Sequence, residues 1–553
     1  MKKNVIFWLI RQNKKWIPRL VLLTLSQMGS AIFGVLFALG SRGVIDSAVS
    51  GEVDAFFRAC CRQGGIIAGI LVCLTLTRHL RERLRADMER SWKQRLLHGL
   101  LHGEYSEVSA YHSAELLNRL NNDVTKANEG MISIVPSAAG MATRLTAALA
   151  VLGVLNFRFA LMIAGMGSIV IFSTAFLRRK LKALTKKVSE HDGIVSGFLQ
   201  ELMEKLLMVQ AMDVTQEVER RSDQLLNNRY DIQRRKKNIS LLANTSVSVM
   251  YYSAGFLALM WGAWQLLHGK LSFGSLTAVI QLVNQIQSPV VDLSGLIPKY
   301  LDMTASGERL QELDRIQGQP EPTVEDPQGL YRSMDAIGAE ELSFSYDRDR
   351  VLEGASFRVP KGSFAVVTGP SGIGKSTLLK LLLGVFRPEQ GKLYLYCGGE
   401  KQSLERSMRR IFAYVPQGNL LLSGSIRDNL TIAAPQATEE QIQQAVYVSA
   451  MDAFLPDLPE GLDTQLGESG AGLSEGQIQR LAIARAVLGG APILLLDECT
   501  SALDEQTENT VLQRLRTLPD RTCIAVTHRP AAIALCDYRL ELKDGKICVL
   551  KSE

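Results

Sequence analysis

Two short runs in the C-terminal part of the chain carry residues whose types and spacing suit phosphate chemistry. Gly369-Pro-Ser-Gly-Ile-Gly-Lys-Ser376 fits the pattern G-x-x-x-x-G-K-[ST], in which backbone N–H groups surround a phosphate, lysine reaches its oxygens and serine ligates Mg²⁺. The apolar segment Phe364–Thr368 predicts a strand before the loop, and Thr377–Leu383 predicts a helix after it. The pattern therefore predicts a nucleotide-phosphate site made by Gly369, Ser371, Gly372, Gly374, Lys375, Ser376 and Thr377.

The second run, Ile493-Leu-Leu-Leu-Asp-Glu498, ends with two adjacent carboxylates. Four apolar residues before an acid are typical of a buried parallel strand, which would deliver Asp497 to a Mg²⁺ ion shared with Ser376. Glu498 follows the strand end and points another way, so we expect it to act as general base on the water that attacks the phosphate. His528 ends a further predicted strand, Thr522–Thr527, and is expected in the same catalytic site.

The region from about Leu342 to Val549 resembles the nucleotide-binding domain of ABC transporters, because it carries that family's motifs in their order. The resemblance implies that Tyr346 stacks on the adenine of ATP and that His528 senses the γ-phosphate. It also implies that Gln417, in Tyr414-Val-Pro-Gln417, touches Mg²⁺ and the attacking water. ATP and Mg²⁺ are thus the expected cofactors, and ATP hydrolysis is the expected reaction.

Further motifs imply that the site needs two copies of this domain. Leu473-Ser-Glu-Gly-Gln477 resembles the family signature, with Glu475 where glycine is more common, and Ser501-Ala-Leu-Asp504 resembles the loop at the dimer interface. In this family each ATP lies between one subunit's phosphate loop and the other subunit's signature. The resemblance implies ATP contacts from the partner copy through Ser474, Gly476, Gln477 and Asp504. Because the catalytic motifs are all in working form, we expect a homodimer rather than a heterodimer.

The first 310 residues contain segments long and apolar enough to cross a bilayer. Leu20–Ser41, Phe159–Leu177 and Leu271–Val291 hold 22, 19 and 21 residues without a charge, and a hydrocarbon core needs about 20 residues of helix. Asn238–Gly269 contains no Lys, Arg, Asp or Glu. Two less pure candidates complete six predicted spans: roughly Ala55–Thr77, with Arg58 and Arg62, and roughly Met131–Asn156, with Arg144.

Basic residues gather on one side of these spans. They precede the first and fifth spans and follow the second and fourth, whereas the loops after the third and fifth hold only Arg158 and Lys270. Positive charge marks the cytoplasmic side, so both termini and the nucleotide-binding domain are expected in the cytoplasm of a multi-pass cell-membrane protein. This anchoring explains the net charge of +6, and we infer no nucleic-acid partner; membrane lipid is an expected partner.

Six spans followed by one nucleotide-binding domain resemble an exporter-type ABC half-transporter. The predicted fold is an all-α, six-helix transmembrane domain over residues 1–312, a linker over 313–335, and an α/β P-loop NTPase domain over 336–553. Ala114–Val124 and Phe198–Ala211 resemble the two cytoplasmic coupling helices of this class. The resemblance implies that these helices contact the regions around Gln417 and residues 467–470.

Polar residues within the predicted spans mark a candidate substrate site. Gln281, Gln285, Ser288 and Asp292 share one helical face, which suits either a water-filled cavity or helix packing. Arg144 is the costlier residue, since an arginine at mid-span costs about 2.5–3.5 kcal/mol on insertion scales. It could face the cavity and an anionic substrate, or pair with a buried acid. Asp292 is a poor partner, because counting from the outer ends of the spans places it roughly 12 Å from Arg144 in depth.

The expected function is ATP-driven export of a small molecule, lipid or peptide by alternating access, with two ATP sites in each dimer. Two other functions stay open: an importer with an exporter fold that takes up a metal-chelate-like cargo, and an ATP-gated channel or regulator. The residues of the spans do not show whether the cargo is a peptide, a lipid or a drug.

Overall fold

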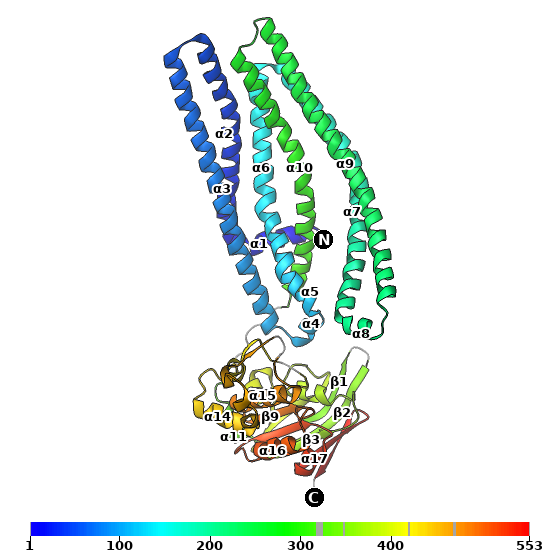
Figure 1. Ribbon diagram of the computed structural model, residues 1–553. Coiled ribbons are helices and arrows are strands. Elements are labelled where there is room, and N and C mark those ends of the chain that lie inside the picture. Colours follow the sequence, from blue (N-terminus) through cyan, green and yellow to red (C-terminus); the bar gives the residue numbers. More distant parts are fainter. Residues whose placement is uncertain (1, 317–323, 347–348, 419–420, 468–471, 552–553) are drawn as a thin grey trace. The chain divides into compact units, whose positions relative to one another are not determined.

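The computed structural model describes the backbone of residues 2–316, 324–346, 349–418, 421–467 and 472–551, and the chain divides into two compact units (Figure 1). Unit 1 comprises Met1–His98 and His112–Arg315, and unit 2 comprises Gly99–Tyr111 and Ile316–Glu553.

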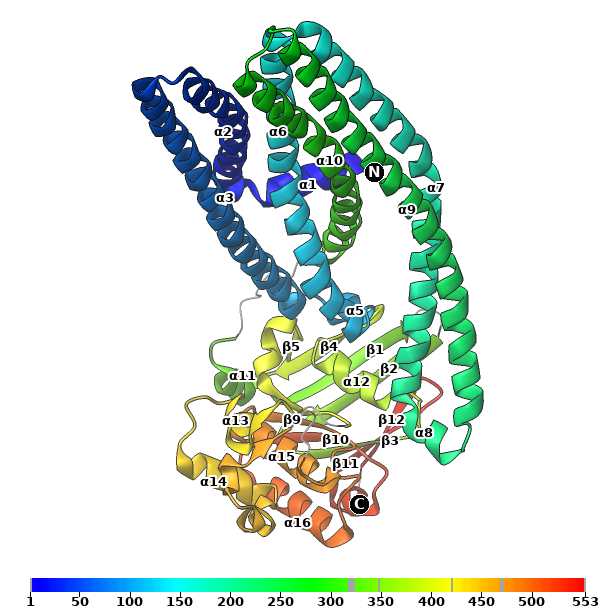
Figure 2. The same cartoon turned by 45° about the horizontal axis from the view of Figure 1, so that its top comes forward.

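Unit 1 is helical throughout its described elements (Figures 1 and 2). Its six long helices are α2 (Ile17–Ser50), α3 (Val53–His102, whose last turn belongs to unit 2), α6 (Val124–Leu155), α7 (Phe157–Glu204), α9 (Thr215–Leu267) and α10 (Phe273–Leu313). The shorter helical segments are α1 (Lys2–Gln12), η1 (Lys14–Trp16), α5 (Ser113–Asn118), the π-helix η2 (Arg119–Asp123) and α8 (Leu206–Ala211).

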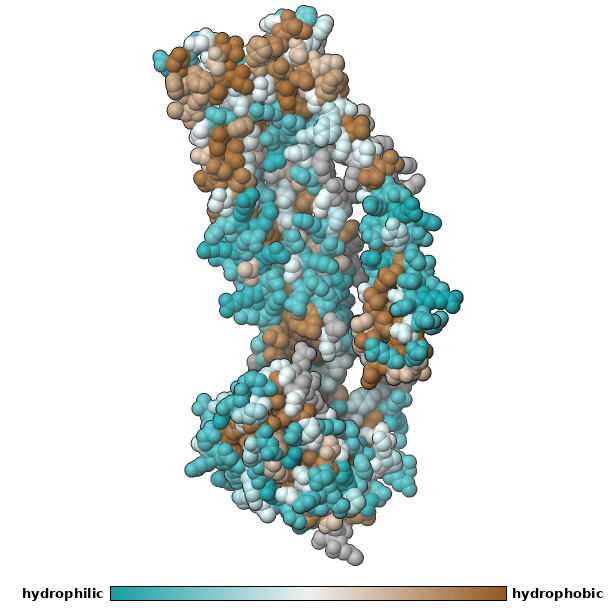
Figure 3. All heavy atoms as spheres, in the orientation of Figure 1, coloured by the Kyte–Doolittle hydropathy of each residue, from teal (hydrophilic) through white to brown (hydrophobic). Residues whose placement is uncertain are grey.

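Each predicted span falls largely within one of the six long helices, from α2 for the first span to α10 for the sixth; the third, fifth and sixth spans extend one or two residues past a helix end. Among the described residues, three helices are apolar and long enough to cross a membrane: Lys14–Ser50, Val53–His102 and Glu115–Leu155. These three correspond to the first three predicted spans. Spans four to six remain predictions. Brown, apolar surface gathers at the end of unit 1 that carries the α2–α3 and α9–α10 connections (Figure 3), as lipid contact requires.

The core of unit 1 lies near that same end, where side chains of five helices are buried together. It includes Val35 of α2, Leu152 of α6, Phe159 of α7, Ala258 of α9 and Leu282 of α10. The ring of Phe159 also stacks on that of Trp261, with centroids 4.3 Å apart. Towards α8, the paired helices α7 and α9 run apart from α6 (Figures 1 and 2).

Unit 2 contains a six-stranded sheet in the order β12-β11-β3-β10-β9-β6, in which only β12 runs antiparallel to its neighbour. Its strands are β3 (Phe364–Thr368), β6 (Phe412–Val415), β9 (Ile493–Asp497), β10 (Thr522–Val526), β11 (Tyr538–Lys543) and β12 (Lys546–Lys551). An antiparallel sheet, in the order β2-β1-β4-β5, contains β1 (Ala336–Tyr346), β2 (Asp349–Pro360), β4 (Gln390–Cys397) and β5 (Glu400–Ser403). A small pair joins β7 (Gly424–Ser425) to β8 (Gln465–Leu466).

The apolar sequences of β3, β9 and β10 bury both faces of the six-stranded sheet. Alternate residues enter two different cores: Leu494 and Leu496 of β9 enter one, and Ile493 and Leu495 enter the other. The first core is completed by α13 (Ile426–Thr431), α14 (Glu439–Val448), α15 (Glu475–Leu488), α16 (Glu505–Arg516) and α17 (Pro530–Leu535). The second core includes α11 (Pro327–Ser333), α12 (Lys375–Leu382) and the antiparallel sheet. Strands buried on both faces explain the continuous apolar runs seen in the sequence.

The stretch predicted as the first coupling helix does not fall in the segment that groups with unit 2. The segment that joins unit 2 is Gly99–Tyr111, with the short helix α4 at Tyr105–Ser109, whereas the predicted stretch 114–124 belongs to unit 1. The reason is local: α5 and η2 lead directly into α6, and the buried Asp123 is held there by Arg309 and Ser306 of α10. Near the second predicted position, α8 forms the reversal between α7 and α9. Residues 468–470 lie outside the described part of the chain.

Candidate functional site

The phosphate loop joins β3 to α12, as the sequence predicts. Lys375 is buried and donates hydrogen bonds from Nζ to the carbonyl oxygens of Gly369 and Pro370, both at 2.9 Å. Gly374 has φ +108°, and a Cβ there would lie 2.1 Å from Val351 Cγ1, so both the backbone and the space require glycine. The lysine ammonium is thus held over the loop whose N–H groups would receive the phosphates.

Asp497 occupies the centre of this site. It is 1% exposed, and its two carboxylate oxygens accept hydrogen bonds from Ser376 Oγ at 2.8 Å and from Tyr414 OH at 3.1 Å. Burial raises the pKa of Asp497 above its ordinary 3.8, while these two hydrogen bonds act in the opposite direction. A buried carboxylate beside a serine hydroxyl is an oxygen pair that suits Mg²⁺, so these residues fit the ion that the motifs imply.

Glu498 turns away from its neighbour because its φ is +46°, a left-handed conformation that non-glycine residues rarely adopt. Its Oε2 accepts a hydrogen bond from Gln417 Nε2 at 2.8 Å, and its Oε1 lies 4.0 Å from His528 Nδ1. The side chain of His528 is 75% exposed. The predicted catalytic residues Gln417 and His528, which come from two other segments, therefore meet at the carboxylate of Glu498.

Tyr346 lies at the end of β1, half exposed, with its hydroxyl 3.3 Å from Thr377 Oγ1. Its ring meets Phe386 edge to face at 5.4 Å, and Phe386 in turn meets Tyr105 of α4 at 5.9 Å. The predicted adenine-stacking ring is therefore joined through Phe386 to the segment that continues α3.

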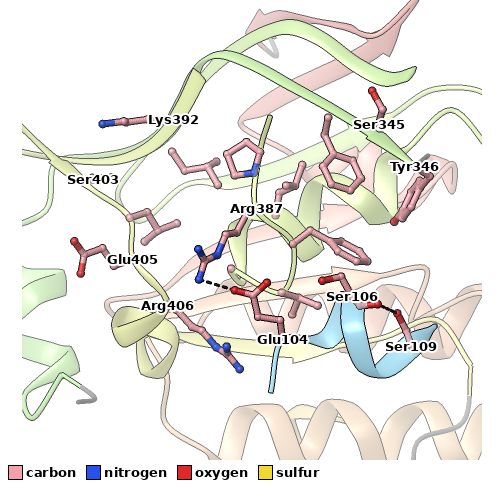
Figure 4. Close-up of a pocket in the computed structure, with 18 residues that line it drawn as sticks. Glu104, Ser106, Ser109, Ser345, Tyr346, Arg387, Lys392, Ser403, Glu405 and Arg406 are labelled. Atoms are coloured by element: carbon pink, nitrogen blue, oxygen red, sulfur yellow. Dashed lines mark hydrogen bonds and ion pairs between the residues drawn. The ribbon is translucent and has the colours of Figure 1, made fainter. Parts of the chain in front are cut away.

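A cavity of about 770 Å³ lies beside this aromatic group (Figure 4). Tyr346 lines one end of the cavity and Glu405 lines the other, while Glu104 reaches Arg387 in an ion pair at 2.6 Å. Arg406 donates hydrogen bonds to the carbonyl oxygens of His102 and Gly103, at 3.4 and 3.0 Å. The α3–α4 segment is thus held in unit 2 by an ion pair, by a contact between aromatic rings and by hydrogen bonds to its backbone carbonyl oxygens.

The residues predicted to contact a partner's ATP lie at two helix starts. Ser474 caps α15 and exchanges hydrogen bonds with Gln477, so within one chain Gln477 serves the cap. Asp504 caps α16 by accepting from Thr507 N, and hydrogen bonds from Thr507 lower the pKa of its carboxyl. A Cβ on Gly476 would lie 3.0 Å from the Ala502 carbonyl oxygen, which brings the two motifs together.

Two residues of the site were missed by the sequence analysis. Tyr414 donates to Asp497, and its place three residues before Gln417 on β6 could have identified it. Gln479 bridges the signature helix to the next motif, because its side chain bonds Ser501 Oγ and the Ala502 N–H, both at 3.0 Å. Nothing in the sequence spacing indicated that bridge.

The predicted substrate residues lie in unit 1. Arg144 of α6 donates a hydrogen bond to Ser288 Oγ of α10 at 3.2 Å, one helical turn from Asp292. The structure thus places Arg144 closer in depth to Asp292 than the counting from span ends did, since one turn is about 5.4 Å. Asp292 is exposed, and Gln285 lies beside Gly34 of α2.

A phosphate loop, a strand-end Asp-Glu pair and a parallel sheet buried on both faces define unit 2 as a P-loop nucleotide hydrolase. Comparison with known families extends this result to both units. Residues 19–290 match the ABC transporter transmembrane region, and residues 352–501 match the ABC transporter family. The chain belongs to the ABC transporters, with a transmembrane domain and an ATP-binding domain in one polypeptide.

Individual relatives agree with this assignment. The probable ABC transporter ATP-binding/permease protein of Haemophilus influenzae is 30% identical over 380 residues, which cover 68% of this chain and 67% of that protein. ABC transporter B family member 1 of Dictyostelium discoideum is 28% identical over 464 residues, covering 82% of this chain and 50% of that protein. The chain spans about half the length of several curated relatives that it matches.

A solved structure of a bacterial Atm1-family ABC exporter with ATP bound has the same fold, with a TM-score of 0.78 at 23% sequence identity. The alignment covers 97% of this chain and 94% of that one. The fold is therefore that of an ABC exporter.

Proposed function

We propose that this chain is one half of an ATP-driven exporter, in which two identical copies enclose two ATP molecules and move cargo by alternating access. The observation that carries the proposal is the complete catalytic set in a single chain: Asp497 with Ser376, and Glu498 with Gln417 and His528. A chain that served only as the inactive half of an unlike pair would not need all five.

In this proposal Lys375 and Ser376 bind the phosphates of ATP, and Tyr346 stacks on the adenine. Asp497 and Ser376 would hold Mg²⁺, which supplies positive charge to the phosphate oxygens when it is bound. Glu498 accepts the proton of the attacking water, Gln417 orients that water, and His528 contacts the γ-phosphate. Ser474, Gly476, Gln477 and Asp504 of the second copy would complete the site.

The exposed end of the α7–α9 pair supports the second copy. Around α8, four apolar side chains are between 42% and 81% exposed: Leu206, Leu207, Met208 and Met212. This end lies in the predicted cytoplasmic part, where lipid does not cover it. Apolar clusters exposed to water mark surfaces that a protein partner buries, and a second copy of this chain is the partner that the ATP site also requires.

The anchoring of α4 supports transmission of ATP binding to the membrane helices. Tyr105, Phe386 and Tyr346 form a continuous ring contact from the adenine side of the site to the end of α3. Closure of two copies around ATP would act on this contact, and α3 would carry the displacement to its membrane-spanning part. Both termini and unit 2 are placed in the cytoplasm in this proposal.

The dimer can be tested with cysteines placed across the proposed interface. A chain carrying Ser371→Cys and Ser474→Cys, purified alone in nanodiscs, should form a disulfide-linked dimer when ATP is added and hydrolysis is blocked by Glu498→Gln. Chains with a single substitution are the control for the native cysteines. A double variant that crosslinks no more than the single variants would contradict the shared site.

The direction of transport can be tested with fluorescent lipid, peptide and drug probes in vesicles of opposite orientation. An exporter should accumulate its probe with ATP in inside-out vesicles, where unit 2 faces the medium. Accumulation only in right-side-out vesicles loaded with ATP would establish import instead, and ATP-dependent ion current without accumulation would establish a channel.

A further inference from the structure

Polar side chains of α10 meet α6 and α2 in unit 1, within the predicted spans. Arg144 of α6 bonds Ser288 of α10, and a Cβ on Gly34 of α2 would lie 3.3 Å from Gln285 Nε2 of α10. One turn from Arg144, a Cβ on Gly140 would lie 3.5 Å from Gln27 Cβ of α2. We call the set Arg144, Gln285 and Ser288 the polar level; Gln27 and Gln281 lie on opposite sides of it along the helices, about 16 Å apart.

The polar level is not satisfied by its own residues. Arg144 Nε is shielded from solvent and has no hydrogen-bond partner among the described residues. Buried polar atoms are nearly always paired in folded proteins, so an unpaired guanidinium nitrogen within a span needs an explanation. An anionic ligand that accepts a hydrogen bond from this nitrogen is such an explanation.

Arg144 sets the charge of the ligand. No carboxylate within the described residues forms an ion pair with it, and Asp292, one turn from Ser288, is exposed. A charge inside a span is costly unless it is paired, and it marks a functional site by default. An anion that enters the polar level would neutralise the guanidinium and accept from its Nε.

We infer that the polar level binds the acidic group of a transported organic anion, with Arg144 as the charge contact and with Gln285 and Ser288 as polar neighbours. This inference rests on the proposed function and names its substrate class. The acidic group could belong to a free solute or to an anionic lipid headgroup, since both present the same chemistry to a guanidinium.

The test uses two dyes that share a xanthene ring system, fluorescein as the anion and rhodamine 6G as the cation. Binding to the full chain in phosphatidylcholine nanodiscs is measured by fluorescence anisotropy. The wild type should bind fluorescein more tightly, and Arg144→Gln should weaken fluorescein by about tenfold or more without weakening rhodamine 6G. Arg144→Lys should keep most of the preference. Added phosphatidylglycerol that displaces fluorescein identifies a lipid headgroup as the ligand, whereas no displacement identifies a soluble anion.

Two matched variants separate binding from packing. Arg81→Gln removes another arginine whose Nε is buried without a partner, but outside the polar level, and should leave both dyes unchanged. Ser288→Ala removes the α6–α10 hydrogen bond yet keeps the charge, so it should weaken fluorescein less than Arg144→Gln does; an equal loss would show that packing, not charge, sets the preference. If wild type does not prefer fluorescein, or if Arg144→Gln weakens it less than about twofold, the inference is wrong. ATP hydrolysis is measured in every sample: its loss in wild type removes the proposed function, whereas normal hydrolysis with no anion preference removes only this inference.

Discussion

The ATP site and the polar level both place charged groups where water is scarce, but they treat these groups differently. At the ATP site, Asp497 already accepts two hydrogen bonds and Glu498 accepts one from Gln417. In the polar level, Arg144 has one hydrogen bond, to a neutral serine, and its Nε has none within the described residues. One site is held in place by its own side chains, and the other leaves its charge for a ligand.

The contrast follows from what each site must do. Hydrolysis repeats one reaction on one substrate, so its groups gain from being fixed before ATP arrives. A transport site must release its cargo after each cycle, and a guanidinium saturated by a protein carboxylate would have nothing left to bind it. The paired charges of the ATP site and the unpaired charge of Arg144 therefore lead to different predictions for their substitution.

The largest effect is expected for Glu498→Gln, which removes the proposed general base from a site that is otherwise complete. Steady-state phosphate release in nanodiscs should fall by about a hundredfold or more, because no other carboxylate contacts Gln417 among the described residues. Glu505→Gln, at the exposed start of α16, is the control and should remain active. Retained activity in Glu498→Gln would show that another group takes the proton.

The next effect concerns a paired charge in unit 1. Asp123 is 1% exposed and accepts from Ser306 Oγ and Arg309 Nε, at 2.9 and 2.7 Å. Asp123→Ala should lower the free energy of unfolding by about 2–3 kcal/mol, because it leaves those donors without their acceptor. Thermal unfolding in nanodiscs measures the loss, with the exposed Asp302→Ala as control. Equal free energies of unfolding for the two variants would mean that these hydrogen bonds do not stabilise the fold.

The third prediction uses the raised pKa of Asp497. Burial favours a proton on this carboxyl in the folded state, so the stability gained from that proton is present at low pH and is lost as pH rises above 3.8 through the raised pKa. Asp497→Asn should therefore unfold at a higher temperature than wild type at neutral pH without nucleotide, while losing Mg²⁺-dependent hydrolysis.

Asp428→Asn provides the opposite control for that experiment. Hydrogen bonds from Ser425 lower the pKa of Asp428, so its ionised form stabilises the fold above the ordinary pKa and the amide should unfold at a lower temperature. If both asparagine variants shift the unfolding temperature in the same direction, the effect of Asp497 on stability does not come from burial of its carboxylate.

The smallest effect is expected at the edge of the cavity in unit 2. The side chains of Arg387 and Glu104 are 77% and 40% exposed, so their ion pair should contribute less than about 1 kcal/mol. A double-mutant cycle with Arg387→Gln and Glu104→Gln, followed by thermal unfolding, measures this coupling. A coupling above about 2 kcal/mol would indicate that the pair is buried in the working assembly.

Much of the ATP site could be predicted from sequence because its residues lie in short motifs with fixed local geometry. The loop from Gly369 to Ser376 has its own turn chemistry, and an apolar strand before Asp497 fixes where that acid must appear. Tyr414 and Gln479 were missed because their partners lie far along the chain, at Asp497 and at Ser501. Such contacts depend on which strands and helices become neighbours.

The helices of unit 1 show the same limit. Length and composition place the apolar segments that become α2, α3 and α6, but they did not show that Gly99–Tyr111 groups with unit 2 while residues 114–124 stay in unit 1. Charged, helical sequence continues on both sides of Gly103, so no local pattern marks where the chain reverses. At α4, Tyr105 contacts Phe386 and Glu104 contacts Arg387, and both partners lie far along the chain.

By itself, the sequence determined the class of this protein: a membrane domain followed by a P-loop ATPase, with its phosphate loop, its Asp-Glu pair and its arginine within a span. Only the tertiary structure decided which groups are paired. It turned Glu498 away from Asp497 through a left-handed residue, and it set Arg144 against Ser288 rather than against an acid. Motifs report local chemistry, whereas the pairing of charges depends on distances between segments that only the packed fold brings together.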